Sequence, residues 1–472
     1  MRLLVPIVLI LCLFPLPVFA QDGDCPAPLV ETDGPTVLTT ITPDGYVVYS
    51  AQWLSSGGTY GQSIHSVPLD GSAPPVELYY SESNVVVNGI FRVSPDGEYV
   101  TFAPTQHEVR VVRVVDGTVA MTLTLDETLL DILLAGPEFA PNGHDLLLLT
   151  GGELQQLVHV TFPSGEMNVI TDRIARDWFL ARNAEGWTFV QLADDGTPQV
   201  VYQQVVAPFT TTVLSGDLDV TRLMDVHSSL VFLATEDRAV FETSPSYDTT
   251  SLYAVTFDGQ ETTLLYTGIP SMEGMASPDG QWLAFSRGGV LWLVPLDGSA
   301  PAREIAQRFP YPVYQFTPDS QHLVYLDADS VLYFLPLDGG EPFVAARGLT
   351  FSENFLLNAV GDDFLLREAA PNGTRFASYI LPGSLDDAPR LLFESVWDYQ
   401  YGPFFMIDGD TLVYRQFDGE VTTFWQARAA DDYAPVAVGC PLDGHARLLG
   451  LGDGRALIAV DNGAALISVP LD

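Results

Sequence analysis

The chain repeats a short pattern of polar turns and apolar strands along most of its length. The stretch SPDGQWLAFSRGGVLWLVPLDGSAPAREIA at residues 277–306 is followed forty residues later by TPDSQHLVYLDADSVLYFLPLDGGEPFVAA. In both, a Pro-Asp turn precedes two apolar runs rich in β-branched and aromatic residues, and a second Asp-Gly turn follows. Such runs predict β-strands. Proline presets φ, aspartate hydrogen-bonds its own backbone and glycine accepts positive φ, so each turn joins two strands.

Corner turns of this kind divide the chain into about ten units. They begin, clearly or in degenerate form, at Thr42, Ser94, Ala140, Asn183, Asp225, Ser277, Thr317, Ala359, Met406 and Leu451. The first and last turns lie 451 − 42 = 409 residues apart over nine intervals, which gives a period near 45. Four short strands in a unit of this length are typical of a β-propeller blade.

We therefore predict an all-β protein, a β-propeller of four-stranded antiparallel blades. Ten units exceed the usual four to eight blades of a ring. Seven to ten blades, two smaller rings or a decorated ring therefore remain open, with a single closed ring favoured. The last unit ends at Asp472 after three strands, and an unpartnered segment, APLVETD, lies at residues 27–33. Pairing of this N-terminal strand with the last unit would complete the last blade and remove exposed sheet edges.

The SPDG units resemble the blades of TolB-like β-propellers, a WD-repeat-like group of exported bacterial proteins. The resemblance covers nearly the whole chain after residue 20, and it rests on turn formers and core strands that any such blade needs. It implies the fold and says little about function. The chain shows neither the small α/β domain that precedes the propeller in TolB nor the hydrolase domain of propeller-capped peptidases.

The first twenty residues predict a signal peptide. Arg2 precedes an apolar run that ends at Val18-Phe19-Ala20, with small residues at the positions that a signal peptidase reads. Prolines within the run argue against a retained membrane anchor. We expect cleavage after Ala20, which leaves a propeller domain of residues 21–472 in the periplasm or outside the cell.

The net charge of the chain limits the classes of partner that can bind to it. The chain has 20 basic and 60 acidic residues and a formal charge of −40, and every basic residue is arginine. Such a surface repels phosphate backbones and anionic lipid headgroups. We therefore expect a monomer that binds no nucleic acid and does not insert into a membrane after signal cleavage. A protein, peptide or glycan on the cell envelope or outside the cell remains a possible partner.

Two cysteines remain after signal removal, Cys25 and Cys440, in a compartment that favours disulfides. The repeat register puts them at opposite ends of neighbouring strands, about 20 Å apart. A disulfide requires Cα atoms within about 7 Å. Free buried thiols are therefore the expectation, and a disulfide would show that this register is wrong.

No motif indicates catalysis or a bound cofactor. The chain contains no Gly-x-Ser-x-Gly, His-Glu-x-x-His, Gly-rich phosphate loop or Cys-x-x-Cys motif. Its seven histidines are scattered, and sixty carboxylates guarantee chance pairs, so we predict no catalytic and no metal-binding residue. Acidic loops at Leu192 and Leu326 could bind Ca²⁺ through oxygen ligands, although they lack the EF-hand pattern.

Two long insertions predict where a ligand binds. SAQWLSSGGTYGQS at residues 50–63 and ATEDRAVFETSPSYDTT at residues 234–250 follow the second strand of their units. Both should rise from the face opposite the corner turns, which we call the loop face. We expect four aromatic residues of exposed loops to bind the ligand there, unless they pack within their own loops: Trp53, Tyr60, Phe241 and Tyr247.

The predicted function is that of an exported, non-catalytic β-propeller that binds a protein, peptide or glycan through its loop face. The alternative is a secreted or periplasmic carbohydrate-active enzyme with carboxylates at the channel mouth. A purely structural component of the envelope is a third possibility.

Overall fold

Within the residues that it describes, the computed structural model consists mainly of β-strands, with a short 3-10 turn at η3 (Ala429–Asp431). The residues that it describes are 27–32, 36–54, 60–82, 91–126, 137–140, 143–151, 154–182, 185–205, 209–216, 218, 233–246, 249–268, 273–307, 314–329, 331–347, 356–360, 363–369, 375–381, 390–396, 405–443, 446–460, 463 and 465–471. Within these ranges, no helix has the length and apolar character needed to cross a membrane. The predicted signal peptide, residues 1–20, lies outside them.

Most of the described strands form antiparallel sheets of four strands that are consecutive in the chain. In the first half of the chain these strands are β2 (Thr36–Ile41), β3 (Tyr46–Leu54), β4 (Tyr60–Pro68) and β5 (Val76–Ser81); β6 (Phe91–Val93), β7 (Tyr99–Thr105), β8 (Glu108–Arg113) and β9 (Val119–Thr124); and β17 (Leu233–Ala234), β18 (Arg238–Ser246), β19 (Thr249–Thr256) and β20 (Thr262–Gly268).

The second half repeats the same arrangement. Its strands are β21 (Glu273–Ala276), β22 (Trp282–Arg287), β23 (Val290–Pro295) and β24 (Arg303–Gln307); β25 (Tyr314–Phe316), β26 (His322–Leu326), β27 (Val331–Pro336) and β28 (Phe343–Arg347); β29 (Leu356–Val360), β30 (Asp363–Ala369), β31 (Arg375–Leu381) and β32 (Arg390–Val396); and β33 (Phe405–Asp408), β34 (Thr411–Phe417), β35 (Val421–Arg428) and β36 (Val436–Asp443). The four-strand prediction is confirmed for these units.

One sheet of the described chain has seven strands because β13 belongs to two units. Its strands are β10 (Glu138–Phe139), β11 (Leu146–Gly151), β12 (Leu154–Thr161), β13 (Glu166–Arg182), β14 (Gly186–Leu192), β15 (Pro198–Gln204) and β16 (Thr211–Val213). The first part of the 17-residue β13 pairs with β12, from Glu166 opposite Thr161, and its end pairs with β14, where Arg182 lies opposite Trp187. One long strand therefore replaces the fourth strand of one unit and the first strand of the next.

The last sheet joins the two ends of the described chain. It contains β37 (Arg447–Gly452), β38 (Arg455–Val460), β39 (Ala465–Pro470) and β1 (Val30–Glu31). β1 pairs antiparallel with β39, Val30 opposite Leu466, and the Thr32 hydroxyl donates to the Gly463 carbonyl at 3.1 Å. The predicted pairing of the segment at residues 27–33 with the last unit is thus confirmed.

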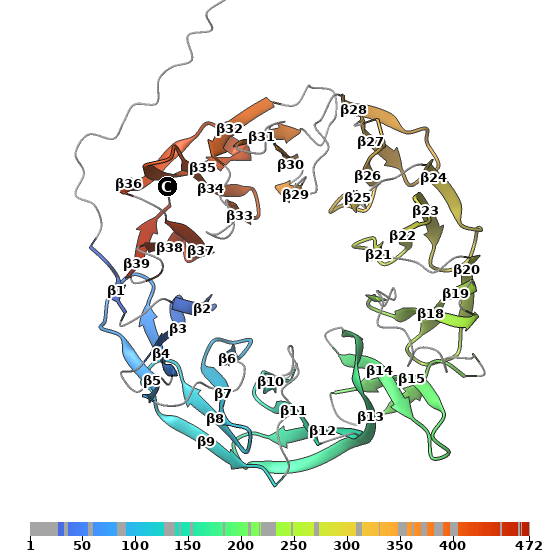
Figure 1. The fold of residues 1–472 in the computed structure, drawn as a ribbon, viewed down its shortest axis with the longest axis horizontal. Coiled ribbons are helices and arrows are strands. Elements are labelled where there is room, and N and C mark those ends of the chain that lie inside the picture. The colour runs from blue at the N-terminus through green and yellow to red at the C-terminus, as the bar shows by residue number, and fades with distance from the viewer. Residues whose placement is uncertain are drawn as a thin grey trace, which may run out of the picture.

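The sheets stand around a common centre, with the first strand of each nearest the centre and the fourth at the rim (Figure 1). Apolar side chains fill the spaces between neighbouring sheets. Ile64 of β4, for example, packs with Phe102 of β7, and Tyr49 of β3 packs with Leu457 of β38. The core is therefore divided among the junctions between sheets, where alternate residues of each strand meet.

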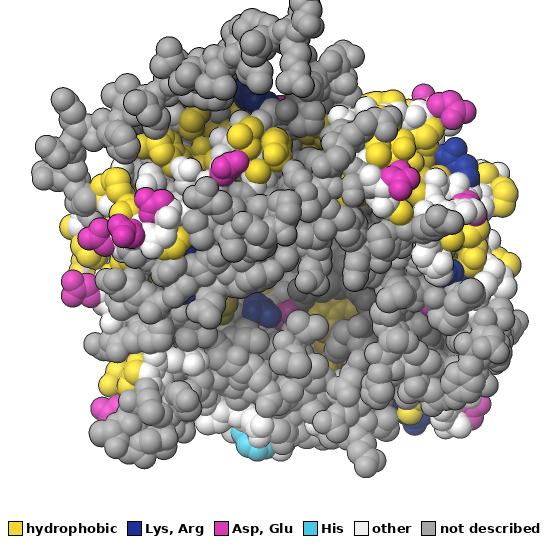
Figure 2. Space-filling model, turned by 45° about the horizontal axis from the view of Figure 1, so that its top comes forward, with side chains coloured by type: hydrophobic (Ala, Val, Ile, Leu, Met, Phe, Trp, Pro, Cys, Tyr) yellow, Lys and Arg dark blue, Asp and Glu magenta, His cyan; other side chains and the backbone are white. Residues whose placement is uncertain are grey.

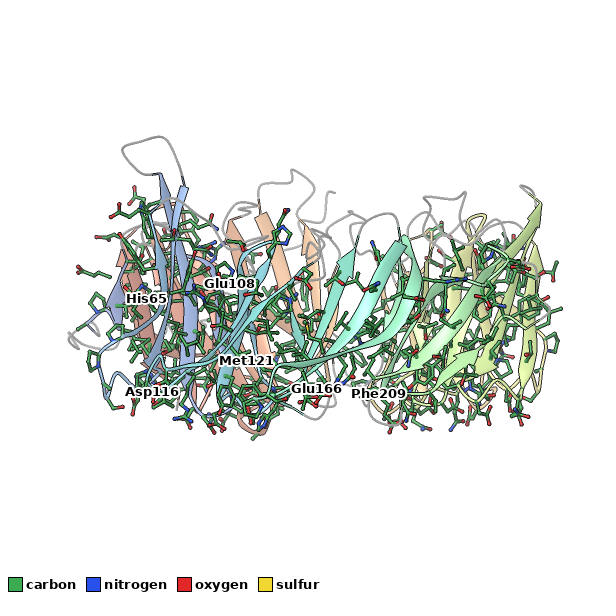
Figure 3. All side chains as sticks on the ribbon, turned by 90° about the horizontal axis from the view of Figure 1, so that it is seen from below. His65, Glu108, Asp116, Met121, Glu166 and Phe209 are labelled. Carbon is green, nitrogen blue, oxygen red and sulfur yellow. The ribbon has the colours of Figure 1, made fainter. Side chains whose placement is uncertain are left out.

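The turns within each sheet define two faces. Corner turns link the first strand to the second, and a further turn links the third to the fourth. Asp116 belongs to a turn of this second kind, and Glu166 directly follows another. In the side view both lie at one face of the molecule (Figure 3). We call this the turn face, and the opposite one is the loop face.

One predicted corner is wrong. The repeat pattern puts it at Asp225, which lies outside the described residues, whereas the structure has the corner between β17 and β18, at residues 235–237. Thr235 Oγ1 donates to Asp237 Oδ1 at 3.1 Å there, as Ser277 Oγ donates to Asp279 Oδ1 at 2.5 Å in an SPDG corner. The TEDR sequence has neither proline nor glycine, so hydrogen bonds rather than turn-forming residues close this corner: beside the Thr235 hydroxyl contact, the Thr235 amide donates to the Arg238 carbonyl at 2.9 Å.

The expectation of a free thiol at Cys440 is also wrong, because Cys440 is disulfide-bonded. β36 continues through Cys440 to Asp443, and a Cβ on Gly439 would lie 3.2 Å from Val469 Cγ1 of β39. Since β1 runs antiparallel to β39 with Val30 opposite Leu466, the chain before Val30 leads towards Val469. The prediction put Cys440 beyond the end of its strand, whereas it lies within β36. The other cysteines, Cys12 and Cys25, lie outside the described residues.

Candidate functional site

The four aromatic residues predicted to bind a ligand do not form one site. Trp53 lies on β3 and Phe241 on β18, in sheets on opposite sides of the centre in Figure 1. Tyr247 and the side chain of Tyr60 lie outside the described residues.

Trp53 packs against its own sheet. Its ring stacks on Tyr80 of β5, with 5.5 Å between ring centroids, and it covers Gly61, the residue opposite it on β4. A Cβ on Gly61 would lie 2.6 Å from Trp53 Cε2, so the absence of a side chain at Gly61 makes room for the indole. This contact fits the alternative that the aromatic residue packs locally, and ligand binding by Trp53 remains a prediction.

Phe241 is not an exposed residue of a loop, contrary to the prediction. It is fully buried in β18, in an apolar cluster with Val200 and Val255. The error follows from the corner that was put at Asp225: once the corner is at residues 235–237, the segment containing Phe241 becomes the second strand of its sheet. Alternation along that strand then directs Phe241 into the core.

A cavity of about 480 Å³ opens on the turn face, between the sheets β17–β20 and β21–β24. Two corner turns and the turn between β23 and β24 surround it. It is lined by Glu236, Asp237, Arg238, Asp279, Gly280, Gln281, Trp282, Pro295, Leu296, Asp297 and Ser299. We call it the turn-face cavity. Its volume lies within the range of small-ligand and side-chain pockets.

The turns around the cavity are held by aspartate side chains. Asp279 Oδ1 accepts hydrogen bonds from the Ser277 hydroxyl at 2.5 Å and from the Gln281 amide at 3.1 Å. Asp297 Oδ1 accepts the Ser299 amide at 2.9 Å. Each aspartate therefore uses one carboxylate oxygen to close its turn, and the negative charge stays at the cavity wall.

Arg238 ties the two sheets together beside the cavity. Its Nε and Nη2 donate to the two carboxylate oxygens of Asp237 at 3.0 and 2.7 Å, and its Nη1 donates to the Leu296 carbonyl of the next sheet at 3.0 Å. Planar bidentate pairing fixes the guanidinium. Arg238 is consequently occupied by its own aspartate, and Glu236, Asp279 and Asp297 give the lining a net negative charge.

The carboxylates at the turn-face cavity are ionised, which suits the binding of a cation better than proton transfer. The hydrogen bonds from Arg238 lower the pKa of Asp237, and the backbone hydrogen bond from Ser299 lowers the pKa of Asp297. Both carboxylates therefore stay ionised at neutral pH, whereas a general acid needs a raised pKa. Trp282 and Pro295, paired across β22 and β23, supply the apolar part of the wall.

This cavity could not be recognised in the sequence, because closing their turns is a sufficient structural role for the turn aspartates. The available signal was the run Glu236-Asp237-Arg238, which breaks the usual turn chemistry with three adjacent charges. Acidic side chains, in magenta, are also spread over the described part of the face seen in Figure 2.

The acidic loops considered for calcium have local hydrogen-bonding roles. Asp195 Oδ1 accepts the Thr197 amide at 2.9 Å, and Asp327 Oδ1 accepts the amides of Asp329 and Val331 at 2.9 and 3.0 Å. Calcium binding at these loops remains a prediction.

Comparison with known proteins assigns neither a family nor a function to the chain. No family model and no curated protein matches the chain. The propeller-type fold rests on the arrangement of the described four-stranded sheets around a common centre (Figure 1). Among solved structures, an oligogalacturonate lyase in complex with manganese is 11% identical, with 66% of this chain and 88% of that chain covered and a TM-score of 0.33. BamB from Moraxella catarrhalis is 10% identical, with 94% and 100% covered and a TM-score of 0.33. TolB from Acinetobacter baumannii is 11% identical, with 84% and 81% covered and a TM-score of 0.25.

Proposed function

We propose that this protein is an exported, non-catalytic β-propeller that binds a basic segment of a protein or peptide partner at its turn-face cavity. The observation that carries the proposal is a concave site between two sheets with a net negative lining and an apolar wall formed by Trp282 and Pro295. An arginine or lysine side chain fits this chemistry, because its cation pairs with carboxylates and its stem or guanidinium packs on an indole.

The surrounding charge favours the same class of partner. A chain with a formal charge of −40 attracts basic segments over long range and repels phosphate and anionic lipid surfaces. Binding through the loop face, by Trp53 or Tyr60, is a separate prediction, and the experiment below distinguishes it.

We further infer that the sheets form a single closed ring of ten blades. Ten apolar clusters in the described chain join neighbouring units in sequence order, and one of them joins the last sheet to the first through Val30, Val47 and Leu457. Another packs Leu157 of β12 against Phe189 of β14, which supports counting the seven-stranded sheet as two blades. A rigid ring would hold the cavity wall in one geometry and limit the entropic cost of binding.

The test is an affinity capture with the mature chain, residues 21–472, against envelope and secreted extract, read by mass spectrometry. Removing one charge-assisted contact should weaken capture about tenfold, as expected for a loss of about 1.5 kcal/mol. Glu236→Gln and Asp297→Asn should each show this loss, and capture should fall as salt rises. Asp338→Asn is the matched control, because Asp338 closes an equivalent turn by accepting the Gly340 amide at 3.1 Å, away from the cavity.

Either of two results would contradict the proposal. If Trp53→Ala abolishes capture while the cavity variants retain it, binding is through the loop face. If the protein degrades a polysaccharide, and a single carboxylate substitution near the channel mouth abolishes that turnover, the carbohydrate-active alternative is correct.

A further inference from the structure

We propose that Asp96, Glu98 and His144 form a binding site for a divalent transition-metal ion such as Zn²⁺, across the junction of two neighbouring sheets. This site is separate from the proposed function. The turn-face cavity lies between β17–β20 and β21–β24, whereas these three residues belong to the sheets that begin with β6 and β10.

Two consecutive corner turns supply the three side chains. Asp96 and Glu98 lie between β6 and β7, and His144 lies between β10 and β11. One ligand atom from each residue can be chosen so that all three lie within 4.8 Å of one another. His144 Nε2 is 2.6 Å from Asp96 Oδ2, and the two side chains are 44% and 43% exposed, so an ion from solvent can reach them.

The aspartate and the imidazole are held in place by their surroundings. Asp96 Oδ1 accepts the Ser94 hydroxyl at 2.6 Å and the Glu98 amide at 3.0 Å, which leaves Oδ2 directed at the imidazole. The His144 ring meets the edges of Tyr99 and Phe162, with ring centroids 5.8 and 6.0 Å away. Packing and hydrogen bonds of this kind orient metal ligands in known sites.

The charges near the site permit a cation. Arg113 Nε lies 3.7 Å from Glu98, and its Nη1 lies 3.6 Å from Asp116. When Glu98 turns to a metal ion, Arg113 therefore keeps Asp116 as its partner.

The donor set indicates the class of metal. One imidazole and two carboxylates suit Zn²⁺, which takes four ligands, and water can complete the coordination. Ca²⁺ prefers six to eight oxygen ligands. Two ligands on one Zn²⁺ ion lie about 3.4 Å apart at bond lengths of about 2.1 Å, so coordination replaces the direct hydrogen bond between Asp96 and His144.

The combination of a turn aspartate with a glutamate two residues later and a histidine from the next corner is found at this junction and not at the two similar corners that follow. The equivalent of Glu98 is Gln281 in the SPDG corner at Ser277 and Gln321 in the corner at Thr317, and an amide is a poor ligand for Zn²⁺. The site therefore does not follow from the repeat itself, which specifies only the turn aspartate.

Calorimetric titration of ZnCl₂ into the untagged, oxidised mature chain, after treatment with a chelator, tests the proposal. We expect one saturable equivalent and a rise in melting temperature with Zn²⁺ that CaCl₂ does not reproduce. His144→Ala and Glu98→Gln should each weaken binding at least about tenfold, the equivalent of about 1.4 kcal/mol. His107→Ala is the control, since His107 is an exposed histidine at the turn between β7 and β8, and it should bind as the wild type does.

Two outcomes would overturn the proposal: no saturable binding by the wild type, which would make Asp96 and His144 an ion pair only, or binding that both variants retain. Glu98→Gln is conservative and exposed, so it keeps the test decisive even if His144→Ala disturbs the junction. Circular dichroism of each variant establishes that it is folded before titration.

Discussion

The buried ion pair between Glu242 and Arg287 offers a sharp test of how two sheets are joined. Glu242 lies on β18 and Arg287 on β22, and their side chains are only 1% and 2% exposed. Arg287 Nη2 donates to Glu242 Oε1 at 2.7 Å and to the Thr250 hydroxyl, and the guanidinium lies 4.7 Å from the centre of the Tyr266 ring. Among the residues that the structure describes, its Nε and Nη1 have no hydrogen-bond partner.

Replacement of Glu242 by glutamine should be strongly destabilising. It keeps the size and an oxygen acceptor but removes the charge that compensates the buried guanidinium. Breaking a buried pair in this way costs about 3–5 kcal/mol, and we expect the lower end, about 3, because the acceptor remains. For a chain of 472 residues the unfolding entropy is about 1 kcal/mol per degree, so the melting temperature should fall by about 3 °C.

A double variant shows whether an uncompensated buried charge, rather than lost contacts, causes this destabilisation. In the double variant Glu242→Leu, Arg287→Met neither charge of this pair remains, so its stability should return to within about 1 kcal/mol of the wild type or exceed it. Glu108→Gln is the control: its partner Arg110 lies 2.5 Å away, but the pair is about one-third exposed, and the cost should stay below about 1 kcal/mol.

Urea unfolding, followed by tryptophan fluorescence and circular dichroism, measures these differences as shifts in midpoint at constant slope. If the free energy of unfolding of Glu242→Gln lies within about 0.5 kcal/mol of the wild-type value, the ion pair does not compensate a desolvation cost of Arg287. If the double variant is as unstable as the sum of its single changes, lost contacts rather than an uncompensated charge explain the effect.

Three further outcomes can be checked. Peptide mapping should find Cys440 linked to Cys25, and reduction or Cys440→Ser should lower stability by up to about 5 kcal/mol because the bridge closes a very long loop. Gly97→Ala should lower the melting temperature more than Gly196→Ala does. Both glycines have φ near +80°, but of the two only Gly97 would bring a Cβ against the neighbouring corner, at 3.0 Å. The pKa of Asp96 is lowered to about 2 from 3.8, so its contribution to the free energy of unfolding is complete above pH 4 and is lost as pH falls towards 2. The stability of Asp96→Asn should lack this part of the dependence on acid pH.

The four-strand unit and the pairing of the chain ends could be predicted from the sequence because both depend on local rules. Pro, Asp and Gly mark the corners, and alternation marks the strands. The corner at residues 235–237 could not be found in this way, because Thr235 and Asp237 make the same side-chain hydrogen bond with neither proline nor glycine beside them. An error of ten residues at that corner moved Phe241 from the core to a loop.

The candidate site could not be predicted, because it depends on which turns become neighbours. Asp237 and Asp297 lie sixty residues apart and belong to different sheets, and nothing local to either shows that they share a cavity. The expectation of a free thiol at Cys440 was wrong for a related reason. The bulge between β35 and β36 and the continuation of β36 to Asp443 put this cysteine inside the strand instead of beyond its end.

On the turn face, structural and binding roles fall on the same residues, because corners of neighbouring sheets contact one another. Ser320 occupies the glycine position of its corner with φ at +56°, and its hydroxyl accepts the Asp279 amide of the preceding corner at 3.0 Å. The strain of a left-handed serine is thereby offset by a hydrogen bond between sheets. A substitution that removes a turn aspartate would disturb both the turn and any bound partner. Changes of Asp to Asn retain an oxygen that can accept the turn's backbone amide and remove only the charge, so they are the substitutions that can separate recognition from folding on this face.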